Sequence, residues 1–252
     1  MQRGQARPPI PVTQMTVCGP HTTVNNRFLS ALPSTTQALL GPHLTPILLE
    51  RRQRLFEPGD PPTSIYFVTC GLVSLVKSMD DGRLAEVGAV GAEGVVCLSG
   101  LLDLRATTLE ALVQVPGEAL RIDTTTLHDV AAREPALAAL MRDYAGVAIA
   151  AMAQTAACNR LYGLSERCCR WLLSAHDSAG NDSFGLTHEL LALMLGVQRP
   201  AVSLAANALQ REGLIRYSNG QVTVLDRAGL EAGACECYGA MQDRLDAVFG
   251  AA

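Results

Sequence analysis

Residues 186–213 read LTHELLALMLGVQRPAVSLAANALQREG, and this pattern predicts two helices joined by a short turn. Thr187 is suited to cap the first helix, because its hydroxyl can accept a hydrogen bond from a backbone N–H that the helix leaves free. Gly196 ends that helix, and the second begins near Gln198, with Pro200 in its first turn where the missing N–H costs nothing. Two helices three residues apart predict a helix-turn-helix.

A β-hairpin is predicted directly after the second helix. Residues 214–217 and 221–225 favour strands, and they flank Ser218-Asn219-Gly220. Asn-Gly is the strongest short signal for a hairpin turn. A hairpin at this place is the wing of a winged helix-turn-helix, so residues 186–224 predict a DNA-binding module.

The length and composition fit a folded protein of two domains. The chain has 252 residues, 48% of them hydrophobic, and no uninterrupted apolar run of the roughly 18 residues that a membrane helix needs. Residues 1–25 contain prolines and polar residues where a secretory signal would be apolar. We therefore expect a mobile N-terminal arm and a cytoplasmic protein that does not bind membranes.

The charge is weakly biased toward the predicted DNA-binding half. The whole chain carries −4, whereas residues 160–225 contain six arginines and five acidic residues. This small positive balance predicts that backbone N–H groups, helix N-termini and dimerisation contribute to DNA affinity alongside charge.

The pattern between residues 48 and 122 is typical of an antiparallel β-barrel or jelly roll. Short strands are predicted at 65–68, 72–76, 84–87, 112–115 and 119–122, after a short helical region that is broken at Pro33. Turns are predicted at Pro58-Gly59-Asp60, Cys70-Gly71, Asp80-Asp81-Gly82 and Pro116-Gly117. Short strands at this spacing, without helices between them, predict a barrel domain over residues 26–134.

A long helix is predicted next, over residues 135–162. One face recurs at three- and four-residue steps and consists of Leu137, Met141, Tyr144, Ala148, Ala151, Thr155 and Cys158. This face either packs on the barrel of its own chain or forms the seam of a parallel dimer, in which the many alanines let two backbones approach. We expect the dimer, since a helix-turn-helix protein normally needs two DNA-binding modules one DNA turn apart. We call each such module, here the winged helix-turn-helix, the reading head.

The cysteines do not form a recognisable metal or disulfide pattern. They are Cys18, Cys70, Cys97, Cys158, Cys168, Cys169, Cys235 and Cys237. A disulfide framework is not expected in a cytoplasmic chain, and the Cys-x-x-Cys pairs of zinc and iron–sulfur sites are missing. We expect mostly reduced, buried thiols and no metal site.

The order of barrel, long helix and winged helix-turn-helix resembles that of the Crp/Fnr family of bacterial transcription regulators. The resemblance covers about residues 48–225. It is carried by FEPGD at 56–60, IYFV at 65–68 and GLV at 71–73 in the barrel, and by GVQRPAVS at 196–203 and LQREGLI at 209–215 in the reading head. One branch of the family is similar in QTAACNR at 154–160, RWLL at 170–173 and CECY at 235–238.

The resemblance implies an α+β protein with an N-terminal antiparallel barrel, a dimerisation helix, a winged helix-turn-helix over residues 163–225 and a C-terminal helical extension over 226–252. It implies a homodimeric, sequence-specific transcriptional regulator that binds double-stranded operator DNA and RNA polymerase. An enzyme is not expected, because no Ser/His/Asp arrangement, Gly-rich phosphate loop or metal-spaced His pair occurs.

The chain departs from the family where a cyclic nucleotide would bind. Nucleotide-binding members carry a Gly-Glu pair for the ribose and an Arg for the cyclic phosphate. Here Gly91-Ala92-Glu93-Gly94 differs in arrangement, and the Arg position falls at Leu109 or Glu110, where a carboxylate would repel phosphate. We therefore expect no cyclic nucleotide cofactor.

Other effectors stay open. The candidate effector-binding residues are Glu93, Gly94, Arg105 and Thr107. An alternative function is a sensor that responds to cyclic nucleotide or to thiol redox, or whose barrel binds a different small ligand. A four-cysteine iron–sulfur cluster is not expected, because only Cys18 precedes the barrel.

The reading head also departs from the best-known members. Pro200 and Leu204 stand where those members have Glu and a second Arg, so a changed operator is expected. Arg199 fits either a bidentate contact to guanine or a phosphate contact. The candidate DNA-binding residues are Thr187, His188, Gln198, Arg199, Ser203, Asn207, Arg216, Ser218 and Asn219.

Two further interpretations concern the C-terminal half. Trp171 is expected in the core, given the area that an indole buries. A helix is predicted after Asp226, and the cysteines of the branch motifs raise the hypothesis that Cys158, Cys235 and Cys237 form a thiol sensor.

Overall fold

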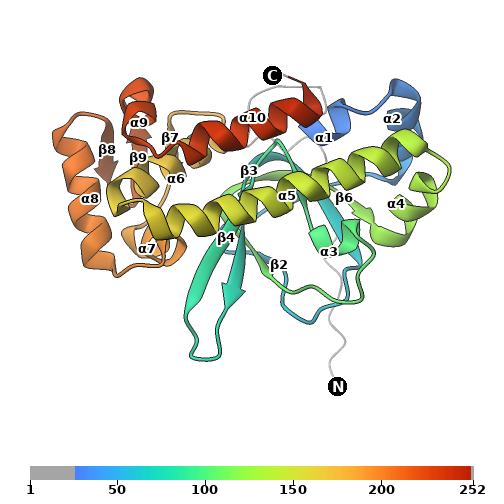
Figure 1. Cartoon of the computed structure of the whole chain (residues 1–252), viewed down its shortest axis with the longest axis horizontal. Helices are drawn as coiled ribbons and strands as arrows, with labels where there is room; N and C mark the ends of the chain where they lie inside the picture. The colour runs from blue at the N-terminus through green and yellow to red at the C-terminus, as the bar shows by residue number, and fades with distance from the viewer. Residues whose placement is uncertain (1–25, 251–252) are drawn as a thin grey trace.

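The computed structural model describes residues 26–250, so the predicted arm at 1–25 lies outside the described part. A β domain occupies the first half, a long helix crosses it, and helices with a small sheet form the second half (Figure 1). The elements of the first half are α1 (Arg27–Ser30), α2 (Ser34–Leu40), η2 (Gly41–His43), β1 (Thr45–Leu49), β2 (Arg54–Phe56), β3 (Ser64–Ser78), β4 (Leu84–Val90), β5 (Val95–Val96), α3 (Leu98–Leu101), β6 (Glu110–Asp123) and α4 (Thr124–Ala131).

The second half contains the long helix and the reading head. Its elements are α5 (Pro135–Leu161), α6 (Leu164–Ala179), β7 (Ser183–Gly185), α7 (His188–Leu195), α8 (Arg199–Arg211), β8 (Ile215–Ser218), β9 (Gln221–Val224), α9 (Arg227–Gly233) and α10 (Cys237–Phe249). The predicted α+β class and the order of its parts are confirmed. Within this half the sequence did not predict the short strand β7.

The first-half sheet is antiparallel throughout and has the order β1-β6-β3-β4, with β2 also paired to β6 and β5 to β3. The short strands β1, β2 and β5 and the helices α3 and α4 were not predicted. The turn at Asp80-Asp81-Gly82 is confirmed, because Gly82 N donates to the Met79 carbonyl between β3 and β4.

The predicted turns at Cys70-Gly71 and Pro116-Gly117 are wrong, because β3 and β6 each run straight through them. The two strands pair across these positions with register shifts, which mark β-bulges. A Cβ on Gly117 would lie 2.0 Å from the Cys70 carbonyl oxygen, and one on Gly71 would lie 2.6 Å from the Val115 carbonyl oxygen. The glycines therefore bend two long strands at a close backbone approach and do not reverse the chain.

Helix α5 is confirmed, but the face predicted as a dimer seam is largely buried within its own chain. Leu137, Met141 and Tyr144 pack in one cluster with Phe28 and Phe67 of the β domain. The Tyr144 hydroxyl donates to the Val95 carbonyl at 3.1 Å and accepts from Val95 N at 2.8 Å. The alternative interpretation, packing on the chain's own barrel, is thus correct for this face.

The C-terminal helix α10 runs alongside α5 and contacts it (Figure 1). By length and composition, α5 is also apolar enough to cross a membrane, and only 22% of its most apolar window is buried inside the structure. Much of the surface of α5 that faces away from the β domain is therefore apolar and uncovered.

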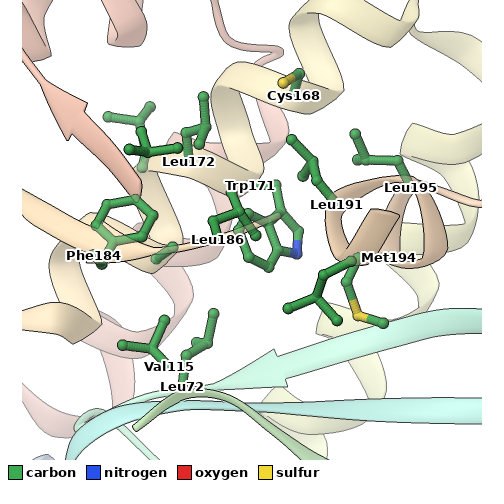
Figure 2. Close-up of a cluster of buried hydrophobic side chains, with 14 of the residues drawn as sticks. Leu72, Val115, Cys168, Trp171, Leu172, Phe184, Leu186, Leu191, Met194 and Leu195 are labelled. Atoms are coloured by element: carbon green, nitrogen blue, oxygen red, sulfur yellow. The ribbon is translucent and has the colours of Figure 1, made fainter. Parts of the chain in front are cut away.

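One hydrophobic cluster joins the β domain to the reading head (Figure 2). Trp171 of α6 is 1% exposed, which confirms its expected place in the core. The cluster includes Leu72 and Val115 from the β domain and Leu191 and Met194 from α7. The β domain and the reading head therefore share one hydrophobic cluster, in addition to the clusters that the β domain forms with α5.

The glycine pair gives the first prediction. We expect Gly117→Ala to destabilise the protein by at least about 3 kcal/mol, because the new Cβ would overlap backbone atoms of Cys70. Urea unfolding followed by circular dichroism measures the change. Gly239→Ala in α10, where a Cβ meets nothing within 4 Å, is the matched control and should be neutral or slightly stabilising. Equal stability of the two variants would contradict the bulge assignment.

Candidate nucleic-acid interface

The helix-turn-helix has the local geometry that its sequence predicts. Thr187 caps α7 by accepting a hydrogen bond from Leu190 N at 3.2 Å, and Gly196 ends the helix in the left-handed region with φ 64°. The chain direction turns by 108° between α7 and α8, within the range of helix-turn-helix motifs. Asn219 and Gly220 have φ of 51° and 73° between β8 and β9, as a tight hairpin turn requires.

Three of the nine candidate DNA-binding residues also hold the reading head together. The His188 Nδ1 lies 2.9 Å from the Ser203 Oγ, and the Ser203 hydroxyl also lies 3.1 Å from the Arg199 carbonyl, which accepts from it. The His188 ring packs on Tyr217 with a centroid distance of 4.3 Å. Burial, followed by the charge of Arg199, lowers the pKa of His188, so a neutral imidazole is favoured here. Thr187, His188 and Ser203 are accordingly half-buried.

The other six candidates are exposed. They are Gln198, Arg199, Asn207, Arg216, Ser218 and Asn219. Leu204 lies on the same helix as Arg199 and Asn207 and is 73% exposed, unusually high for a leucine. The exposed side of α8 therefore presents a cation, an amide and an apolar side chain.

A basic turn of the β domain, which the sequence did not predict, lies beside the reading head. Arg52 and Arg54 line an open groove of about 630 Å³ together with Gln198 and Arg199. Arg51 approaches β7, because a Cβ on Gly185 would lie 3.0 Å from its guanidinium. The run Glu50-Arg51-Arg52-Gln53-Arg54 was the available signal, but only the fold places it beside α8.

A buried carboxylate lies where the β domain meets α6. The Ser74 hydroxyl donates to Glu86, and Trp171 Nε1 donates to Glu86 Oε2 at 3.2 Å. Burial raises the pKa of Glu86, while the hydrogen bond from Ser74 and the nearby Arg170 act in the opposite direction. The protonated carboxyl group is therefore favoured at this contact.

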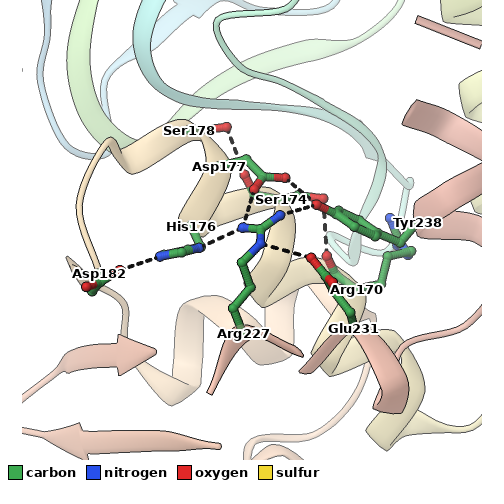
Figure 3. A network of polar contacts seen from close by, with 9 residues as sticks. All are labelled: Arg170, Ser174, His176, Asp177, Ser178, Asp182, Arg227, Glu231 and Tyr238. Carbon is green, nitrogen blue, oxygen red and sulfur yellow. Dashed lines mark hydrogen bonds and ion pairs between the residues drawn. The ribbon is translucent and has the colours of Figure 1, made fainter. Parts of the chain in front are cut away.

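A polar network fixes α9 and α10 to α6 (Figure 3). Arg227 donates to Asp177 at 2.6 Å, to Glu231 at 2.9 Å and to the Tyr238 hydroxyl at 2.7 Å. The Tyr238 hydroxyl donates to Asp177 at 2.8 Å. The predicted C-terminal helix is thus anchored to the reading head as well as to α5.

The candidate effector residues do not meet in one site. Glu93 is half-buried, accepts from Gly91 N at 2.7 Å, and lines a cavity of about 50 Å³ between β4 and α5. Gly94 is needed for packing, since a Cβ would lie 2.4 Å from the Tyr144 hydroxyl. Arg105 is exposed, and the Thr107 hydroxyl donates to the Glu57 carbonyl; neither lines that cavity.

The cavity beside Glu93 is small for a ligand site. Small-molecule sites occupy about 300–1,000 Å³, far more than this cavity. Met241, Arg244 and Leu245 of α10 also line it.

Three thiols far apart in the sequence lie together. The Sγ atoms of Cys158, Cys235 and Cys237 are all within 4.8 Å of one another, and those of Cys158 and Cys235 are 3.3 Å apart. The hypothesis that grouped these three therefore has the geometry it needs. Burial raises the pKa of Cys235 to about 12.

The other described cysteines have separate surroundings. Cys97, Cys168 and Cys169 are free and buried in the hydrophobic clusters of the β domain and the reading head. Burial raises the pKa of Cys168 to about 12 and that of Cys169 to about 11.

Comparison with known proteins gives two domain matches. Residues 46–134 match the cyclic nucleotide-binding domain, and residues 166–232 match the Crp-like helix-turn-helix domain. No curated protein matches the chain.

Several solved structures are similar in fold. The c-di-GMP responsive global regulator CLP from Xanthomonas campestris is 19% identical, with a TM-score of 0.61 over 76% of this chain and 99% of its own. FixK2 from Bradyrhizobium japonicum is 19% identical, with a TM-score of 0.61 over 76% and 98%. A CRP-family transcriptional regulator from Thermus thermophilus is 26% identical, with a TM-score of 0.56 over 75% and 96%.

Glu86 gives a prediction of pH dependence. Burial raises the pKa of Glu86 in the folded state above its value in the unfolded state. The protonated side chain therefore contributes fully to the stability of the fold at pH values below the unfolded-state pKa. This contribution is lost as the pH rises through the folded-state pKa. Glu86→Gln keeps an acceptor for Ser74 and Trp171 but cannot ionise. We expect the melting temperature of the variant to exceed that of the wild type at pH 8, and the difference to shrink toward pH 5. A difference that does not change with pH would contradict the assignment.

Proposed function

The chain belongs to the Crp/Fnr family of DNA-binding transcriptional regulators, and from this premise we propose that it binds operator DNA as a cytoplasmic homodimer whose effector is not a cyclic nucleotide. The observation that carries the proposal is the exposed side of α8 beside the β8–β9 wing. The family and its structural relatives are regulators of transcription, not enzymes. Contact with RNA polymerase is part of the proposal.

Arg199 is the proposed base-reading residue. It is exposed at the first turn of α8, and a bidentate contact from arginine to guanine contributes about 1–3 kcal/mol of discrimination. Leu204, exposed one turn further, suits the methyl group of thymine. Gln198 and Asn207 extend the same side, while Arg216, Ser218 and Asn219 of the wing suit phosphate contacts.

The proposed dimer uses a different face of α5 from the one that the sequence suggested. Gly146, Ile149, Ala153 and Ala156 are exposed at alternating three- and four-residue steps. Ile149 is 58% exposed at the centre of this stripe. An apolar stripe of small side chains on a long helix suits close contact with the same helix of a second copy.

The proposed absence of a cyclic nucleotide rests on the small cavity beside Glu93. Helix α10 packs on α5 and contributes part of the lining of this cavity. An effector, if the protein has one, then acts elsewhere.

A footprint on the protein's own promoter region tests the function. We expect protection of two half-sites about one DNA turn apart, and the same pattern with or without added cyclic AMP. Absence of protection at low salt, where binding is strongest, would contradict DNA binding. Protection that requires the nucleotide would contradict the proposed effector choice.

Substitution of Arg199 tests base reading. Arg199→Ala should raise the Kd for the footprinted operator about tenfold or more while leaving binding to unrelated DNA nearly unchanged. Gel-shift titration with both DNAs measures this. Arg133→Ala, which removes the same charge from an exposed site at the end of α4, is the control and should change neither Kd. An equal loss on both DNAs would assign Arg199 to phosphate contact.

Substitution of Ile149 tests the dimer. We expect wild-type protein to have the mass of a dimer in light scattering, and Ile149→Glu to have that of a monomer, since two carboxylates would be buried at the seam. Leu39→Glu, at another exposed leucine in α2, is the control and should stay dimeric. A dimer that tolerates Ile149→Glu would place the seam elsewhere.

A further inference from the structure

The clustered thiols of Cys158, Cys235 and Cys237 come from two segments of the chain, the end of α5 and the start of α10. Cys158 lies in the last turn of α5, the proposed dimer helix, whereas Cys235 lies between α9 and α10 and Cys237 is the first residue of α10. All three are buried, and their exposed fractions are 0%, 4% and 1%. A separation of 77 residues between Cys158 and Cys235 shows that the fold brings them together.

The spacing of the sulfur atoms fits one metal ion. A Zn–S bond is about 2.3 Å, so sulfur ligands of a tetrahedral site lie about 3.8 Å apart. The cluster has one Sγ–Sγ distance of 3.3 Å and none above 4.8 Å. Small side-chain rotations would equalise these distances around an ion.

The surroundings suit a negatively charged thiolate site. Three thiolates and a divalent ion carry a net charge of −1, and Arg167 lies within electrostatic range of Cys158 and Cys235. Within residues 26–250, the Nε of Arg167 is buried without a hydrogen-bond partner. Gln154 Nε2 donates to Cys237 Sγ at 3.1 Å, the kind of contact that orients a ligand from outside the coordination sphere.

A side-chain pair lies next to the cluster at the protein surface. Tyr162 packs on the three cysteines and donates from its hydroxyl to Glu236 at 2.8 Å. Glu236 stands between the two cysteines of Cys235-Glu236-Cys237. The pair therefore holds the connection between α9 and α10 against the end of α5.

A metal site explains the arrangement of the three thiols more completely than plain packing or a disulfide does. Cys97, Cys168 and Cys169 are packed among hydrophobic side chains, whereas Cys158, Cys235 and Cys237 form a cluster of their own. A Cys158–Cys235 disulfide would leave Cys237 and its contact with Gln154 without a role. Three convergent sulfur atoms, a nearby cation and a second-sphere amide are what a thiolate metal site needs.

We propose that Cys158, Cys235 and Cys237 bind one thiophilic metal ion, Zn²⁺ or Cu⁺. Each thiol loses its proton to solvent and forms one metal–sulfur bond, with no change in the oxidation state of sulfur or metal. The three thiolates leave a coordination position that water or an exogenous ligand fills. The ion joins the end of α5 to α10, and through the Arg227 network to α6 and the reading head.

Metal binding by the reduced, full-length protein tests the proposal without DNA. Protein stripped with a chelator under a phosphine reductant is titrated with Co²⁺, followed by displacement with Zn²⁺. We expect about one Co²⁺ per chain, with thiolate-to-cobalt charge-transfer absorption that Zn²⁺ abolishes. A parallel titration with Cu⁺ against a chromophoric Cu⁺ chelator determines which ion binds more tightly.

Four variants that each remove one thiol give the comparison, and a fifth replaces a thiol with another ligand. Cys158→Ser, Cys235→Ser and Cys237→Ser should each weaken binding of the tighter ion at least tenfold, whereas Cys97→Ala, which removes a buried thiol from the β domain, should bind like the wild type. Circular dichroism checks that each variant is folded. Cys237→His keeps a metal ligand at this position, so it should still bind Co²⁺ with a shifted absorption spectrum. Failure of folded wild-type protein to bind either ion, or equal binding by all four variants, would overturn the proposal.

Discussion

The packing of Trp171 between the β domain and the reading head is the contact on which the rest of the structure depends. Helix α6 carries this side chain and buries its neighbours against β3 and β6 on one side and against α7 and α9 on the other. Turning the reading head relative to the β domain would expose this shared cluster to water and separate Glu86 from the indole N–H. The direction in which α8 points is therefore set by a hydrophobic contact and not by a flexible linker.

Helix α10 makes this arrangement different from a simple chain of barrel, helix and reading head. It packs on α5, lines the small cavity beside Glu93, and is anchored to α6 through Tyr238 and Arg227. A ligand between β4 and α5 would have to displace it. The cysteines at the start of α10 provide another place where a chemical signal can act on both α5 and the reading head.

The sequence predicted what local interactions determine. Thr187, Gly196 and Asn219-Gly220 fix their caps and turn through their own backbone conformations, so the helix-turn-helix and wing were predicted to within a few residues. Gly71 and Gly117 carry the same local signal as a turn, but the close approach of the opposite strand makes them bulges. Contacts between segments that are distant in the sequence were not predicted either, because they depend on the fold and not on a local pattern. The placement of Arg52 beside Arg199 is one example. For α5, periodicity identified an apolar face but could not distinguish the chain's own core from a partner.

The central claim is that each reading head is held rigidly on its β domain, so that two copies present their α8 helices at one fixed spacing. The most direct test measures affinity for operators in which the distance between half-sites is varied. Insertion of about 5 base pairs turns one half-site to the opposite side of the DNA, and insertion of about 10 restores its side but not its distance. The account predicts that both insertions reduce affinity to the level of unrelated DNA. Unchanged affinity for either operator would show that the heads move independently, and would contradict it.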